Sequence, residues 1–69
     1  MKLSARNVLP GRVVQINAGA VNTEVTIDLE GGGQIVSIIT KASAERLRLQ
    51  TGARAYAVVK ASDVMIATD

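Results

Sequence analysis

The segment from Val21 to Glu30 is the feature that most limits the fold, because its side chains alternate strictly in character. A period of two is typical of a β-strand with one buried face and one wet face. The run Gly31-Gly32-Gly33 follows and predicts a flexible hairpin connection. The face expected to be buried carries Val21, Thr23, Val25, Ile27 and Leu29, and the wet face carries Asn22, Glu24, Thr26, Asp28 and Glu30.

The remaining apolar runs are also short, and turn residues separate them. A short helix is expected over 42–49, with Thr40 or Ser43 as its cap and Gly52 beyond its end. The order of elements predicts one domain, 1–69, with an all-β fold: a small five-stranded OB-like Greek-key barrel with one short helix between strands 3 and 4. The other expected strands are 11–18, 34–40, 54–60 and 64–67, with an additional strand considered at 3–8.

The strand expected at 34–40 differs from the others, since Ile35 to Ile39 is apolar on both faces. A chain of 69 residues buries little surface, and this one lacks Cys and His, so neither disulfides nor zinc can stabilise it. Small domains of that kind often gain stability by oligomerising. We therefore expect a homo-oligomer in which another subunit covers part of this strand.

Composition argues against several functions. Without His or Cys, the usual general bases and nucleophiles are absent, and the triple glycine lacks the Gly-Lys-Ser/Thr of a P-loop, so no enzyme is expected. No apolar run approaches the roughly 20 residues of a membrane span, and the N-terminus lacks a signal-peptide pattern, which favours a cytoplasmic protein and no membrane partner. The net charge is only +2 and Tyr56 is the single aromatic residue, a poor basis for binding nucleic acid.

Three short segments combine a cation with hydroxyl groups at the ends of apolar runs. A small oxyanion leaving water needs both counter-charge and hydrogen-bond donors, which this combination supplies. Each segment also has a plain structural explanation: a frayed terminus, a helix cap, or a lysine that blunts a strand edge. The segments are Ser4-Ala5-Arg6-Asn7, Thr40-Lys41-Ala42-Ser43 and Lys60-Ala61-Ser62.

The chain resembles the molbindins, the small Mop-type molybdenum–pterin-binding proteins. The resemblance rests on Ser4-Ala5-Arg6-Asn7 with Gly11, on Ser37-Ile38-Ile39-Thr40 with Ser43, and on the run from Val59 to Ile66. It covers nearly the whole chain in the same order, and the length fits a free-standing Mop domain. Leu9-Pro10 departs from the polar residue expected before Gly11.

The resemblance implies a hexamer, built as a trimer of dimers, that stores or buffers molybdate or tungstate at its subunit interfaces. No organic cofactor is expected, because a chain with one aromatic residue gives little support for the family's older association with a pterin. The implied oxyanion-binding residues are Ser4, Ala5, Arg6, Lys60 and Ala61 of one subunit with Thr40, Lys41 and Ser43 of a neighbour. A second oxyanion site is implied near Ala18, Gly19, Val21, Ser37 and Ile39.

Two other functions stay open at the level of sequence. An OB-like fold with mild positive charge is compatible with a nucleic-acid-binding module. The two-sided apolar strand at 35–39 is compatible with an assembly module that binds no ligand. The sequence does not distinguish molybdate from tungstate, since both are tetrahedral dianions of nearly equal size.

Overall fold

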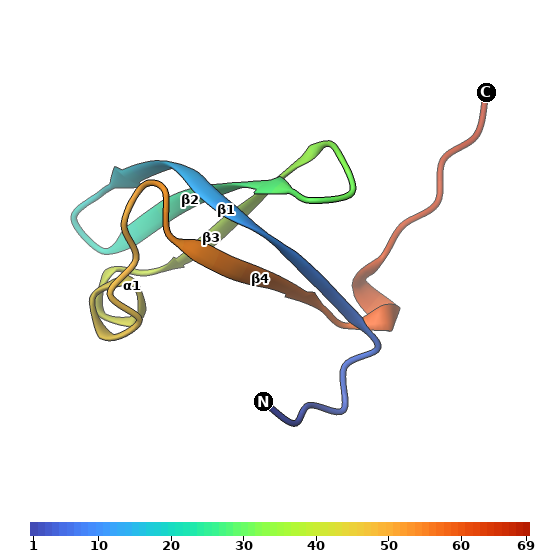
Figure 1. Cartoon of the computed structure of the whole chain (residues 1–69), viewed down its shortest axis with the longest axis horizontal. Coiled ribbons are helices and arrows are strands. Elements are labelled where there is room, and N and C mark those ends of the chain that lie inside the picture. The colour runs from blue at the N-terminus through green and yellow to red at the C-terminus, as the bar shows by residue number, and fades with distance from the viewer.

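Four antiparallel strands form one strongly curled sheet in the computed structural model, which describes all residues 1–69 (Figure 1). Their spatial order is β3-β2-β1-β4, so three strands follow one another and the fourth returns to lie beside the first. That order is a Greek key. The elements are β1 (Asn7–Ala18), β2 (Asn22–Leu29), β3 (Gln34–Thr40), α1 (Lys41–Arg46), β4 (Arg54–Val59) and the 3₁₀ turn η1 (Ala61–Asp63).

The buried face predicted for β2 is confirmed, but Thr26, expected on the wet face, is also buried. Thr23, Val25 and Ile27 are buried on its inner face, where Val13 of β1 completes the core. The β2–β3 turn uses left-handed backbone at Gly32 and Gly33, with φ angles of 102° and 83°, which glycine adopts without steric cost. The inward face of β2 is therefore the one predicted from the sequence. Val21, also expected on that face, is exposed and lies just before β2.

The helix between the third and fourth strands is also confirmed, but it is shorter than expected. Thr40 caps α1, its side chain accepting a hydrogen bond from the Ser43 N–H. The helix ends at Arg46, and the chain reverses at Arg48, which has a left-handed φ of 53°. The N–H groups of Arg48 and Leu49 bond back to the carbonyls of Glu45 and Ala44, the pattern of a Schellman motif.

The first strand begins earlier than the sequence suggested, at Asn7 in place of Gly11. Pro10 is tolerated inside this strand because its bond with Glu30 needs only the proline carbonyl, which accepts from the Glu30 N–H. The N–H that proline lacks is not needed for this bond. The additional strand considered at 3–8 is wrong up to Arg6, and its last two residues belong to β1. β1 pairs with β4 over residues 7–12 and with β2 over residues 11–18, and a bulge between Val13 and Gln15 shifts its register with β2.

The last expected strand, 64–67, pairs with nothing in the chain. After η1 the chain runs away from the sheet as an extended tail (Figure 1). A single chain therefore holds four strands in a half-barrel whose outer edges, β3 and β4, stay open. The expected fifth strand and closed barrel are not present within one chain, because nothing there pairs with the tail.

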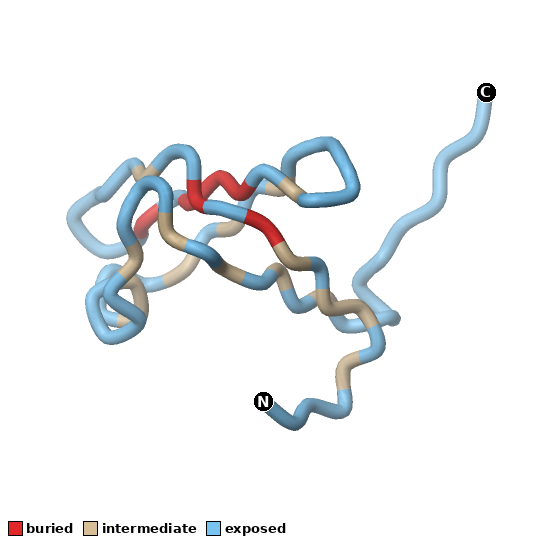
Figure 2. The backbone as a smooth tube through the Cα atoms, viewed as in Figure 1, coloured by how far each residue is buried: buried red, intermediate tan, exposed pale blue.

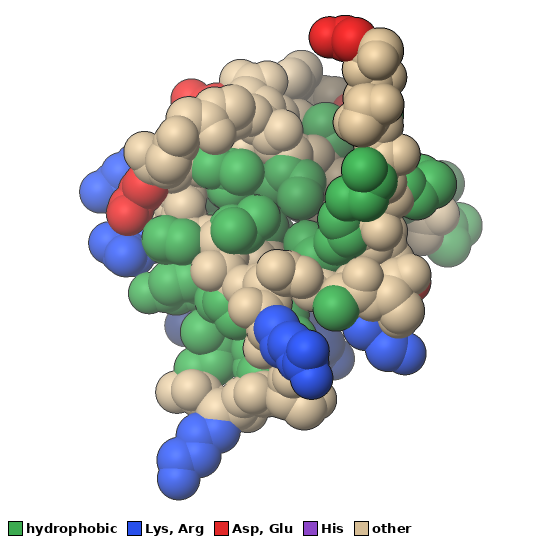
Figure 3. Space-filling model, turned by 90° about the vertical axis from the view of Figure 1, so that its right-hand side faces the viewer, with side chains coloured by type: hydrophobic (Ala, Val, Ile, Leu, Met, Phe, Trp, Pro, Cys, Tyr) green, Lys and Arg blue, Asp and Glu red, His purple; other side chains and the backbone are tan.

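The core of one chain is very small. Only 6 of 69 residues are buried, and they lie along β1 and β2 (Figure 2). The concave side of the half-barrel holds an open apolar hollow of about 350 Å³. Apolar side chains also gather on the face of the molecule that Figure 3 shows. No helix has the length and apolar character needed to traverse a bilayer.

Candidate functional site

The sheet brings the first and third polar segments together at one end. The pairing of β1 with β4 finishes at Asn7 opposite Val59. Arg6 directly precedes β1 and Lys60 directly follows β4, so both residues adjoin this last pair at the same end of the sheet. Ser4 and Ala5 precede Arg6, and Ala61 follows Lys60 into η1. We call Ser4, Ala5, Arg6, Lys60 and Ala61 the cationic half-site.

The second polar segment lies where β3 passes into α1. The Thr40 hydroxyl accepts from the Ser43 N–H at 3.1 Å and donates to the Ser43 Oγ at 2.8 Å. The Lys41 N–H donates to the Val21 carbonyl at 2.8 Å. Because the Thr40 proton is used internally, the Ser43 hydroxyl proton and the Lys41 ammonium are the groups left to bind a ligand. We call Thr40, Lys41 and Ser43 the hydroxyl half-site.

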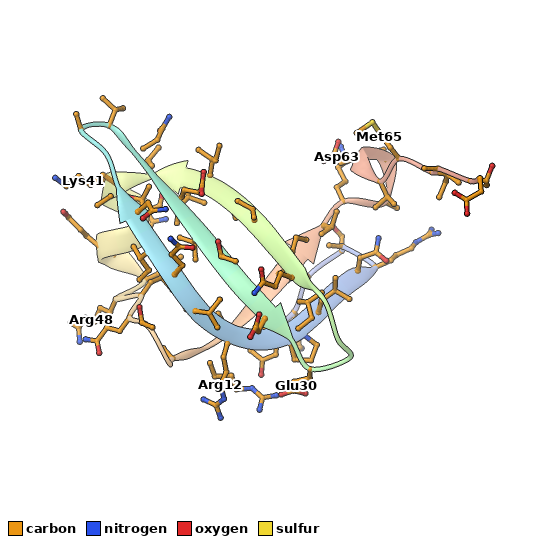
Figure 4. All side chains as sticks on the ribbon, turned by 90° about the horizontal axis from the view of Figure 1, so that it is seen from above. Arg12, Glu30, Lys41, Arg48, Asp63 and Met65 are labelled. Atoms are coloured by element: carbon orange, nitrogen blue, oxygen red, sulfur yellow. The ribbon has the colours of Figure 1, made fainter.

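The two half-sites lie at opposite ends of the sheet. The cationic half-site lies at the start of β1. The hydroxyl half-site lies near the end of β1, because Ala18 pairs with Thr23 of β2 and the neighbouring Asn22 pairs with Thr40 of β3. The 12 residues of β1 separate them by about 36 Å of strand. Figure 4 shows Lys41 at one end of the molecule and Asp63, beside the cationic half-site, at the other. One chain cannot place both half-sites around one small ion.

The residues of the implied second site also lie at the α1 end, but on different surfaces. Gly19 and Val21 belong to the exposed β1–β2 turn, which follows Ala18. The Gly19 N–H donates a hydrogen bond to the Asn22 carbonyl and so closes this turn. Ser37 and Ile39 instead point inward from β3 and line the apolar hollow. The structure gathers these residues in one region without forming a pocket between them.

One buried polar group was not singled out from the sequence. The Thr23 hydroxyl is buried without a hydrogen-bond partner. Its place among the inward positions of β2 was visible in the alternation, although the lack of a partner was not. No group of three His, Cys, Asp or Glu residues is placed to hold a metal cation. The polar groups at the strand ends are thus donors and cations, which suit an anion.

The fold is that of a small OB-like domain, and residues 3–66 match the TOBE domain. A probable molybdenum-pterin-binding protein of Haemophilus influenzae is 45% identical over all 69 residues, covering 100% of both chains. The chain belongs to this family of TOBE-domain, Mop-type proteins.

Solved structures agree with that assignment. MopII from Clostridium pasteurianum superposes with a TM-score of 0.91 at 46% identity, covering 97% of this chain and 100% of its own. The cytoplasmic molybdate-binding protein ModG, in a form with molybdate bound, gives a TM-score of 0.89 at 52% identity. That match covers 94% of this chain and 46% of ModG. The OB-like fold predicted from the sequence is therefore confirmed.

Proposed function

We propose that this protein binds molybdate, or tungstate in its place, at sites shared between the chains of a cytoplasmic homo-oligomer. Its role would be storage and homeostasis of the oxyanion, without catalysis and without an organic cofactor. Relatives named for molybdenum-pterin binding and the molybdate-bound ModG support the ligand class.

The separation of the half-sites is the observation that carries the proposal. Each half-site alone offers too little: the cationic one has Arg6 and Lys60, and the hydroxyl one has Ser43 and Lys41 beside the first turn of a helix. A tetrahedral dianion leaving water needs counter-charge and several donors together. Two chains in contact can supply both, with Ser4, Arg6, Lys60 and Ala61 from one facing Thr40, Lys41 and Ser43 from the other.

The open half-barrel suggests how the chains meet. A second hollow, of about 300 Å³, lies between the edges of β3 and β4, where a fifth strand would close the barrel. The tail at 64–66 has the apolar residues Val64, Met65 and Ile66, all exposed and unpaired. We infer that the tail of one chain fills this gap in another, and that such pairs build the hexamer implied by the family resemblance.

We propose a second oxyanion site at the β1–β2 turns, also formed between chains. Ala18, Gly19 and Val21 are exposed, so they can meet the same residues of neighbouring chains and offer backbone N–H donors to a shared ion. Ser37 and Ile39 line the hollow instead, so we expect them to support this site from within the barrel.

Mixing two defective chains tests whether the site is shared. One variant carries Arg6→Ala and Lys60→Ala, and the other carries Ser43→Ala. Each alone should bind molybdate about 10- to 100-fold more weakly, as expected when a hydrogen bond to a charged group is lost. After unfolding and refolding together, random pairing should return about a quarter of the sites to full affinity, since those sites receive an intact half from each chain.

Isothermal titration calorimetry with molybdate measures the recovered fraction, with sulfate as the competing anion. Lys2→Ala, which removes a cation outside both half-sites, is the matched control and should bind like the parent. Recovery of no sites on mixing would mean that each site lies within one chain. Normal binding by both variants would mean that the chosen residues do not hold the ion.

A further inference from the structure

The tail at 64–69 holds one side chain that oxidation can modify, that of Met65. Met65 is 93% exposed, and Figure 4 shows it near Asp63, away from the sheet. Peroxides oxidise an exposed methionine to methionine sulfoxide, which puts a polar side chain in the place of an apolar one. Met65 of an unassembled chain is therefore open to this modification.

The gap that the tail is proposed to fill is apolar on both of its sides. Successive residues of a strand point to opposite faces, so the Met65 side chain of a seated tail lies on the outer or the inner side of the gap. The exposed Val36 and Val58 border the outer side, and the half-buried Ile35 and Ala57 border the inner side. A thioether fits either side, because methionine is flexible and packs well against irregular apolar surfaces.

Methionine sulfoxide fits the same gap poorly. Its oxygen is a hydrogen-bond acceptor, and burying such a group without a donor costs free energy. Among the side chains that line the gap, only Ser37 and Tyr56 carry a hydroxyl, and the others are aliphatic. Oxidation of Met65 therefore disfavours entry of the tail into another chain.

We propose that Met65 is a site of reversible oxidation by peroxides, and that its sulfoxide prevents the tail from completing another chain. This inference rests on the proposed function, because it needs the exchange of tails between chains. One oxygen atom of the peroxide is transferred to the Met65 sulfur, the O–O bond breaks, and the rest of the peroxide leaves as water or an alcohol. Methionine sulfoxide reductase, with thiols as the reductant, reverses the step and releases the oxygen as water.

Assembly and oxidation compete for the same side chain. A seated tail shields the Met65 sulfur, whereas an unassembled chain exposes it. Only η1 separates Lys60 of the cationic half-site from the tail, so a tail that is not seated also leaves this half-site without its partner. The modification thus makes oxyanion storage sensitive to peroxide.

Treatment with hydrogen peroxide at low protein concentration tests the proposal, with catalase added before any molybdate. The oxidised parent should associate about tenfold or more weakly and bind correspondingly less molybdate. Met65→Leu, a change that keeps the volume of the side chain, is the matched control and retains Met1 as the other methionine. After the same treatment it should associate like the untreated parent. Met65→Gln should behave like the oxidised parent without any peroxide.

Mass spectrometry locates the added oxygen, sedimentation velocity over a dilution series measures association, and calorimetry measures molybdate binding. Reductase with a thiol should restore the oxidised parent, and Met65 should oxidise more slowly as the protein concentration rises. Unchanged association after full oxidation of Met65 would overturn the proposal, as would an equal loss in Met65→Leu or no recovery with reductase. Untreated protein that assembles without binding molybdate would overturn the proposed function alone, since association still tests Met65.

Discussion

At the scale of single residues, Thr23 is the clearest departure from what a stable core requires. Its side chain is 2% exposed, and its hydroxyl meets no donor or acceptor. A buried hydroxyl without a partner costs about 1 to 3 kcal/mol, whereas valine of nearly the same shape carries no such cost. We expect Thr23→Val to raise the free energy of unfolding by about 1 to 2 kcal/mol, measured by urea denaturation at fixed protein concentration.

Thr26 is the natural control for that measurement, since it lies on the opposite face of the same strand and its hydroxyl is not left buried and unpartnered. Thr26→Val should therefore change stability much less. If Thr23→Val lowers stability instead, the Thr23 hydroxyl has a partner that only the assembled protein provides.

At the scale of strands, the lack of a side chain at Gly11 allows the backbones of β1 and β2 to approach closely. It lies between Leu29 of β2 and Ala55 of β4. A Cβ atom added there would lie 2.2 Å from the Asp28 carbonyl oxygen, closer than real contacts allow. We expect Gly11→Ala to cost about 3 kcal/mol, because backbone and not a flexible side chain must move. Gly31→Ala, which meets nothing within 4 Å, is the control in thermal unfolding. Equal stability of the two variants would contradict this account.

The same strands show what the sequence could and could not predict. Alternation predicted the inward face of β2 correctly, because a strand with one buried face carries apolar residues at every second position whatever its neighbours are. Ends were less predictable: β1 includes Pro10, which the carbonyl contact with Glu30 permits but no local pattern reveals. For the candidate site, the types of side chain were visible, while the convergence of Arg6 and Lys60 depends on β1–β4 pairing between distant segments.

At the scale of the whole molecule, one chain buries few residues, which favours the proposed assembly. Its core consists of three apolar side chains, Val13, Val25 and Ile27. Ordering each residue costs about 1 to 2 kcal/mol of backbone entropy, and a small core offers little burial against that cost. If the chain assembles as proposed, the interfaces add buried surface, and folding, association and ligand binding are then thermodynamically linked. Molybdate at about 100 times its dissociation constant would add about 2.7 kcal/mol per independent site.

Removal of the tail separates assembly from the fold of one chain. A chain ending at residue 63 loses Val64, Met65 and Ile66, none of which pairs with a strand or is buried within its own chain. If the chain folded alone, the truncation would change little. If each tail completes another chain, it removes about 1.5 kcal/mol or more for each buried side chain, a large share of the 5–15 kcal/mol that holds typical domains together.

We therefore expect the chain ending at residue 63 to be mostly unfolded at micromolar concentration, whereas the full chain should show a melting temperature that rises with protein concentration. Circular dichroism with sedimentation velocity measures both. A chain ending at residue 67 keeps the three apolar residues and should behave like the full chain, which excludes a general effect of shortening. A folded, monomeric 1–63 chain would show that the half-barrel is stable alone, and the tail exchange would then be wrong.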